Sequence, residues 1–330
     1  FNNSPATHPF TKEKAYDLVF NDQFQKFYKE QSYNQVSFSG DVVDWYKLNR
    51  KDELNVGDYP CSAATDIELG QIVKDRGIDL AKYKRVVFLP NDQSSGGWSS
   101  VGSYGHKINE IYYNFSRACV GLDSFDGKSS NHPFEWKYFD YITSHEMGHS
   151  LGLPHAHGWD GGDTSLGTVR DENGRNSSYI EYGNYFDTMG DGYRALHFNA
   201  AYKEKLGWIK PSQFLNINQS GTYSINTLEK DSAIKFAKVS NYAQSDYPYY
   251  LEYRKAFGFD SDFNNQYISS NQNGLFINNA KGGGEGARLI DTSPTGSGWW
   301  EDTVKATLNS GATFTDPDNG ITIDNVSNPT

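Results

Sequence analysis

The stretch His145-Glu-Met-Gly-His149-Ser-Leu-Gly152-Leu-Pro-His155 decides how the rest of the chain is interpreted. On a helix, His145 and His149 lie about 40° apart in azimuth and about 6 Å apart along the axis, so both imidazoles can reach one metal ion. If the helix continued, His155 would lie about 9 Å further along and on a different face. Gly152 can adopt the left-handed conformation that ends a helix, and the proline two residues later keeps the helix from resuming. The spacing therefore predicts three nitrogen ligands around one ion, with a fourth position left for water.

Three imidazoles with an open fourth position are typical of catalytic zinc, although neutral imidazole also suits copper, iron and nickel. Zinc in such a site lowers the pKa of its bound water to about 7. Glu146, next to the first ligand, is then the expected general base, which takes the proton of the attacking water and passes it to a departing amine. Four of the eight histidines fall between residues 145 and 157, which argues against a solvated helix that carries histidines by chance.

The same stretch resembles the long zinc signature of the metzincin endopeptidases. Met189, in Tyr185-Phe-Asp-Thr-Met-Gly190, resembles their Met-turn, the tight turn that runs beneath the zinc site. Three further segments resemble the gametolysin-like branch of secreted endopeptidases, which is named for an algal enzyme that dissolves cell walls: residues 152–156, 181–190 and 203–208. The algal branch carries glutamine at the position where this chain has His145.

This resemblance implies a metzincin-type α+β catalytic domain, with a mixed sheet covered by helices, which we place at residues 1–210. It also implies an edge strand that holds an extended protein or peptide substrate by strand addition. Some metzincins carry a tyrosine two residues after the Met-turn methionine, whereas that position is Asp191 here and the nearest tyrosine is Tyr193. Tyr193 is therefore our candidate for a contact with the substrate or the transition state.

The pattern ahead of the zinc helix predicts helices that alternate with strands. Residues 11–31 are expected to form one or two helices, and residues 63–75 another, with Ile67, Leu69 and Ile72 as its apolar stripe. Strands are expected at residues 35–39, 44–48, 85–89 and 110–114. The glycine- and serine-rich stretch 94–100 is expected to be a loop.

The pattern changes after residue 211, where glycine, asparagine and proline separate short runs with strand character. These runs are residues 222–225, 233–236, 249–253, 274–277, 287–290 and 320–323. Several short strands with turn signals predict an all-β, sandwich-like domain at residues 211–330. Just before it, residues 199–206 predict a short helix that ends at Gly207.

Two other functions stay open on the sequence alone. In the other large type of zinc peptidase, two histidines and a downstream glutamate bind the metal, and Glu172 or Glu181 would then be the third ligand. In a different class, the chain would be a non-catalytic adhesin or carbohydrate-binding protein with a vestigial zinc site. Trp299 and Trp300 would offer it aromatic surface, although burial in the core is the commoner role for tryptophan. The intact Glu146 favours an enzyme.

Composition limits the partners and the compartment. The net charge of −11 makes nucleic acid or an anionic membrane surface an unfavourable partner, and no apolar run reaches the roughly 18 residues that span a membrane. Cys61 and Cys119 are the only cysteines, and one pair far apart in sequence suits a disulfide in an exported protein better than a metal site or two buried free thiols. The chain starts at Phe1 and its only methionines are Met147 and Met189, so we expect a mature, secreted form. We also expect this form to act as a monomer.

Acidic loops add a second cofactor to consider. The loop at residues 158–176 contains Asp160-Gly-Gly-Asp163, and another acidic turn lies at residues 316–320. Clustered aspartates can bind Ca²⁺ through oxygen ligands, although such clusters are more often simple turns. Asp160 is also a candidate for orienting a ligand imidazole through a hydrogen bond. Calcium therefore stands beside one catalytic zinc ion as a candidate cofactor.

Overall fold

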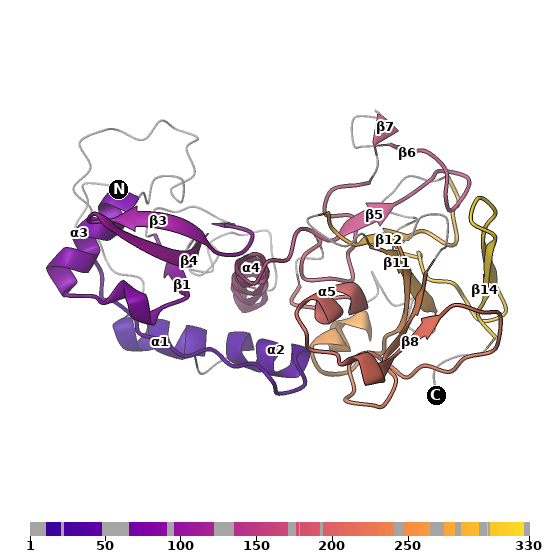
Figure 1. The fold of residues 1–330 in the computed structure, drawn as a ribbon, viewed down its shortest axis with the longest axis horizontal. Helices are drawn as coiled ribbons and strands as arrows, with labels where there is room; N and C mark the ends of the chain where they lie inside the picture. Colours follow the sequence, from indigo (N-terminus) through magenta and orange to yellow (C-terminus); the bar gives the residue numbers. More distant parts are fainter. Residues whose placement is uncertain are drawn as a thin grey trace. The chain divides into compact units, whose positions relative to one another are not determined.

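The computed structural model describes residues 11–20, 23–47, 66–90, 96–121, 135–170, 176–177, 179–191, 194–240, 247–264, 274–280, 285–296, 302 and 304–326 (Figure 1). These residues have the mixed α+β structure that the sequence predicts, and none of their helices is long and apolar enough to cross a membrane. The chain forms two compact units, residues 1–28 with 37–153 and residues 29–36 with 154–330. This division lies at Leu153–Pro154, whereas the domain boundary that the sequence suggests near residue 210 stays a prediction.

The sheet of the first unit is built around one long strand, β4 (Ile111–Val120). Strand β1 (Arg85–Phe88) pairs with β4 in parallel, whereas β2 (Gly97–Ser99) and β3 (Tyr104–Ile108) pair with it antiparallel. The asparagine and glutamate between β3 and β4 have φ of 48° and 66°, a conformation that fits the twist of a two-residue hairpin. Strand β2 lies at the end of the order β1-β4-β2, and it is therefore an edge strand among the described strands of this sheet.

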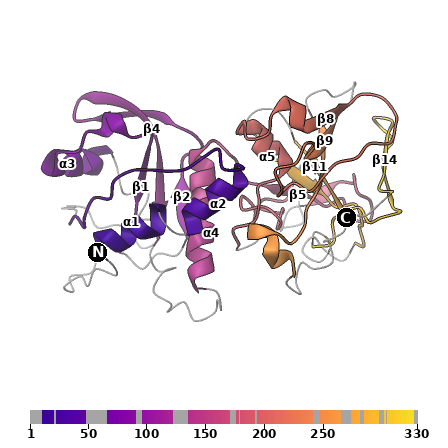
Figure 2. The same cartoon turned by 90° about the horizontal axis from the view of Figure 1, so that it is seen from below.

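Helices cover both faces of this sheet. The helices that precede residue 153 are α1 (Lys12–Phe20), α2 (Gln23–Gln31), α3 (Asp66–Arg76), the 3-10 turn η1 (Leu80–Lys82) and α4 (Glu135–Ser150). Successive residues of a strand point to opposite faces. Accordingly, Val87 of β1 packs with Leu18 of α1 and Ile142 of α4, whereas Val86 packs with Leu69 of α3. Helices α1 and α4 thus lie on one face and α3 on the other (Figure 2).

Several expectations for the first unit need correction. Residues 35–39 and 44–47 are not strands. At Phe38 the side chain of Gln25 takes the place of a neighbouring strand: the amide of Phe38 donates to Gln25 Oε1 at 2.9 Å, and the carbonyl of Phe38 accepts from Gln25 Nε2 at 2.6 Å. The stripe of α3 is also wrong in part, since Ile67 is 84% exposed while Leu69 is buried. The predicted helix start is confirmed, because the amide of Lys14 donates to Thr11 Oγ1 at 3.2 Å.

The second unit contains a six-stranded mixed sheet in the order β5-β12-β11-β10-β9-β8. Its strands are β5 (His157–Trp159), β8 (Phe214–Ile217), β9 (Phe236–Val239), β10 (Tyr249–Tyr253), β11 (Leu275–Asn279) and β12 (Arg288–Ile290). The outer pairs β5–β12 and β8–β9 are parallel, and the pairs between them are antiparallel. Because β5 begins two residues after His155, this sheet fixes the chain just beyond the last histidine of the motif.

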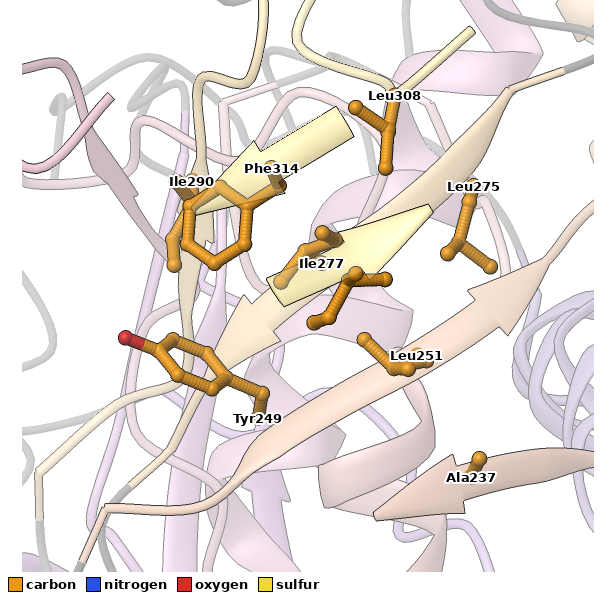
Figure 3. Packing of buried hydrophobic residues seen from close by; sticks show 9 residues of the cluster. Ala237, Tyr249, Leu251, Leu275, Ile277, Ile290, Leu308 and Phe314 are labelled. Atoms are coloured by element: carbon orange, nitrogen blue, oxygen red, sulfur yellow. The ribbon is translucent and has the colours of Figure 1, made fainter. Parts of the chain in front are cut away.

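Both faces of this sheet are covered. Figure 3 shows side chains of one face, among them Leu251 and Ile277, gathered beneath Phe314 of a separate hairpin, which consists of β13 (Thr313–Asp316) and β14 (Ile321–Asp324). On the opposite face, Phe276 packs with Phe186, which lies in the segment that leads to Met189. The core of this unit therefore supports the chain on either side of the Met189 turn.

The remaining elements of this unit are short. They are β6 (Val169–Arg170), β7 (Asn176–Ser177), α5 (Ala200–Lys205), η2 (Pro211–Gln213) and η3 (Gly258–Asn264). Helix α5 confirms the predicted helix, with the side chain of Asn199 accepting from the amide of Tyr202 at 3.1 Å and with Gly207 at φ 73°. Residues 222–225 and 233–235 are not strands, and the sequence missed β5, β6, β7, β8 and β13. A metzincin fold and a β-sandwich stay predictions.

A segment from near the N-terminus belongs to the second unit. Within residues 29–36, the carbonyl of Gln31 accepts from Lys203 Nζ at 2.9 Å, and its side chain accepts from the amide of Phe198 at 3.0 Å. The carboxylate of Glu30 lies 2.8 Å from His197 Nε2. These buried polar contacts tie the end of α2 to residues more than 160 positions later in the chain.

Candidate metal centre

Helix α4 carries two of the three predicted ligands and ends where the sequence requires it to turn. His145 and His149 have ring centroids 4.8 Å apart, and Gly152 adopts φ 97° directly after the helix. His149 Nδ1 lies 2.7 Å from the carbonyl of Leu153. Because a carbonyl can only accept, Nδ1 carries the proton and Nε2 keeps its lone pair for a metal.

His155 is held by its own set of neighbours in the second unit. Its Nδ1 is hydrogen-bonded to the carboxylate of Glu181, and its ring packs against that of Tyr182 with centroids 3.8 Å apart. The hydroxyl of Tyr202 donates to the carbonyl of His155 at 2.6 Å. Glu181, which the sequence offered as an alternative third ligand, therefore contacts the third histidine instead, whereas Glu172 lies outside the described residues.

The three histidines form a group that fits a metal ion. One ligand nitrogen from each of His145, His149 and His155 lies within 4.8 Å of the others. In His149 and His155, Nδ1 is hydrogen-bonded to an oxygen acceptor. This bond fixes the orientation of the ring and leaves the lone pair of Nε2 to bind a metal ion. Three neutral imidazoles are a donor set that suits zinc.

Glu146 has a buried carboxylate that is pressed against the edge strand. It is 4% exposed, and its Oε2 has no hydrogen-bond partner among the described residues. Burial raises the pKa of Glu146 to about 8, and a cation bound by the adjacent histidines would lower this pKa again and favour the carboxylate. A Cβ at Gly97 would lie 2.5 Å from Cγ of Glu146, so β2 can run this close only with glycine at that position. The expectation of a loop at residues 94–100 was therefore wrong at β2 and overlooked a contact with the expected base.

The Met189 turn is buried and is bonded to the residue that follows His155. The amide of Ala156 donates to the carbonyl of Met189 at 2.8 Å, and Met189 is fully buried. Asp187 holds the turn, because its Oδ1 accepts from the amide of Met189 and its Oδ2 from the amide of Asn199, both at 2.7 Å. Sequence reasoning missed this role of Asp187, although an aspartate two residues before a turn residue is a recognised signal for it.

Other predicted residues have different outcomes. At His155, the Nδ1 side is occupied by Glu181 and not by Asp160. Cys119 is buried on β4, but Cys61 lies outside the described residues, so their disulfide stays a prediction. Tyr193 lies outside the described residues as well, together with the two adjacent tryptophans at 299 and 300.

Comparisons with family models, with curated proteins and with solved structures found no match to this chain.

Proposed function

We propose that the protein is a secreted, zinc-dependent endopeptidase of the metzincin type. The observation that carries this proposal is the convergence of His145, His149 and His155, together with a buried glutamate, Glu146, directly beside the first of them. A zinc site that only stabilises the fold does not need a glutamate beside its ligands to accept a proton. Its retention therefore favours an enzyme over a binding protein with a vestigial site.

Zinc held by three imidazoles would lower the pKa of a bound water to about 7 and polarise the carbonyl of the scissile peptide bond. Glu146 would accept the proton of the attacking water through Oε2, the oxygen that has no hydrogen-bond partner among the described residues, and return it to the leaving amine. The carbonyl of Leu153 and the carboxylate of Glu181 would keep the ligand rings in orientation. Met189 and Asp187 would support His155 through the amide of Ala156.

The substrate that suits this arrangement is an extended segment of an extracellular, cell-wall or matrix protein. Strand β2 lies at the end of its sheet, and among the described strands it pairs with β4 alone. An extended peptide could add to its other edge through main-chain hydrogen bonds. Since even a Cβ at Gly97 of β2 would collide with Glu146, such a peptide would lie next to the proposed base. We expect one zinc ion per chain and activity as a monomer.

Glu146→Gln tests this function, because it keeps the size of the side chain and removes the proton acceptor. General base catalysis contributes about 10²–10⁴-fold, so cleavage of a quenched peptide should fall by at least about a hundredfold while zinc content and melting temperature stay unchanged. Glu110→Gln, in the exposed turn between β3 and β4, is the matched control and should keep full activity. Equal cleavage by the wild type and Glu146→Gln would refute the mechanism. Zinc-loaded protein that cleaves nothing would favour the adhesin alternative.

A further inference from the structure

Two aspartates are brought together at the carboxyl ends of neighbouring parallel strands. The register of β5 and β12 pairs His157 with Arg288 and Trp159 with Ile290. The pairing continues one step further, because the amide of Asp291 donates to the carbonyl of Trp159 at 3.0 Å. Asp160 and Asp291 are therefore equivalent positions on adjacent strands. Adjacent strands lie about 4.8 Å apart, and like charges placed opposite each other in this way repel.

A third aspartate completes the group. One carboxylate oxygen from each of Asp160, Asp291 and Asp302 lies within 4.8 Å of the others, and all three residues are buried. The amide of Thr295 donates to Asp302 Oδ2 at 3.1 Å, which attaches this aspartate to the loop that follows β12. In the part of the chain that the structure describes, no lysine, arginine or histidine forms an ion pair with any of the three.

One oxygen of this group has no hydrogen-bond partner among the described residues. Asp291 is 1% exposed; its Oδ1 accepts from the amide of Ser293 at 2.9 Å, but its Oδ2 has no hydrogen-bond donor among the described residues. A buried carboxylate oxygen destabilises the folded state unless it accepts a hydrogen bond or binds a metal ion. Asp160 accepts from the amide of Gly162, and Asp302 accepts from the amide and the hydroxyl of Thr295, so the unpaired oxygen is that of Asp291. Three carboxylates at one point, one of them with an unpaired oxygen, favour a compensating positive charge.

We propose that Asp160, Asp291 and Asp302 bind a divalent calcium ion that is separate from the histidine centre. Carboxylate oxygens without nitrogen or sulfur ligands select a hard cation, and Ca²⁺ accepts the irregular oxygen cages that loops provide, whereas Mg²⁺ demands near-ideal octahedral geometry. The ion would neutralise the repulsion among the three carboxylates and would satisfy Oδ2 of Asp291. Two of its ligands would come from the ends of β5 and β12 and the third from a later turn.

The ion would clamp the sheet at the strand that supports the third histidine. Strand β5 starts two residues after His155 and ends one residue before Asp160. Holding Asp160 against Asp291 would keep β5 in register with β12. Calcium would therefore stabilise the second unit, and because it binds the folded chain, its effect on stability should grow with its concentration.

Calcium binding to the full chain tests this site without using peptide cleavage. The protein is passed over a chelating resin, reloaded with one equivalent of zinc, and titrated with Ca²⁺ alone in a calorimeter and in thermal melts. We expect one site in the wild type, a rise in melting temperature with Ca²⁺, and a smaller rise with Mg²⁺. Asp291→Asn and Asp302→Asn should each weaken Ca²⁺ binding at least about tenfold, because each removes one charged ligand, and should abolish the rise.

A control and a second measurement keep the outcome clear. Asp318→Asn removes an exposed aspartate in the turn between β13 and β14, the other acidic turn of the sequence, and should bind Ca²⁺ like the wild type. Without Ca²⁺, Asp291→Asn should melt at the same or a higher temperature than the wild type, because it removes an unpaired buried charge. The proposal is overturned if the wild type binds no Ca²⁺ at millimolar concentration, if both cluster variants bind it unchanged, or if only Asp318→Asn loses it.

Discussion

Replacing Gly97 with alanine tests whether β2 positions the proposed base. A Cβ at this position would lie 2.5 Å from Cγ and 2.6 Å from Oε1 of Glu146. Carbon atoms in contact need about 3.5 Å, so the glutamate or the strand must move by about 1 Å. Glu146 is buried, and the crowded atom is Cγ, close to the helix backbone, so rotation of the carboxylate end alone cannot relieve the clash.

Such a shift should affect catalysis more than it affects stability. A misplacement of about 1 Å in catalytic machinery can lower the rate about 10²-fold, and overpacking a core typically destabilises by about 1–3 kcal/mol. We therefore expect kcat/KM for a quenched peptide to fall about a hundredfold in Gly97→Ala. Zinc content, measured by elemental analysis, should stay at one ion per chain because no ligand side chain is touched.

Gly105→Ala is the matched control. Gly105 lies on β3 of the same sheet, and a Cβ there would meet no atom within 4 Å. This variant should keep the rate and the melting temperature of the wild type. If Gly97→Ala cleaves peptide as fast as Gly105→Ala, β2 does not position Glu146 and the reasoning is refuted. Loss of zinc from Gly97→Ala would show that the effect reaches the ligands instead.

Two further predictions concern the second unit. Glu181→Ala should weaken zinc binding about 10–100-fold, because the orientation of His155 is lost; unchanged affinity in competition with a chromogenic chelator would contradict this role. Burial lowers the pKa of Lys203 to about 7, whereas an unfolded lysine titrates near 10.4. The unfolded chain therefore binds more protons between about pH 7 and 10, so Lys203 should make stability rise with pH across this window. Lys203→Met should flatten the rise in urea denaturation, and an identical slope in both proteins would count against the assignment.

The ligand histidines could be found from the sequence because their arrangement is local. The periodicity of one helix brings His145 and His149 together, and Gly152 with the proline after it determines where the chain must turn. The start of α1 at Thr11 and the end of α5 at Gly207 were predictable for the same reason. In each case, residues fewer than a dozen positions apart determine the geometry.

Contacts between segments that are distant in the sequence could not be predicted from local sequence patterns. The composition of residues 94–100 indicates a loop, but Gly97 lies in a strand that needs glycine because Glu146 is pressed against it. The alternation at residues 35–39 indicates a strand, but Gln25 takes the hydrogen bonds that a neighbouring strand would make. Glu181 looked like a ligand because glutamate follows the histidines in other zinc peptidases, and only the fold directs it to Nδ1 of His155.

The aspartate cluster shows the same limit. The sequence indicated that Asp160 could bind calcium, but it offered Asp163 as the neighbour. The partners Asp291 and Asp302 depend on the parallel pairing of β5 with β12. A shift of one residue in that register would send the two side chains to opposite faces of the sheet.

The contacts of residues 29–36 have a consequence for the order in which the chain is completed during translation. Glu30 and Gln31 leave the ribosome before their partners His197, Phe198 and Lys203, which follow more than 160 residues later. Contacts that close such long loops form slowly, because the chain entropy of closure must be overcome first. Residues 154–330 therefore cannot reach their final packing by themselves as they leave the ribosome, because they also need residues 29–36. The segment 29–36 therefore has to stay accessible until more than 160 further residues have been made.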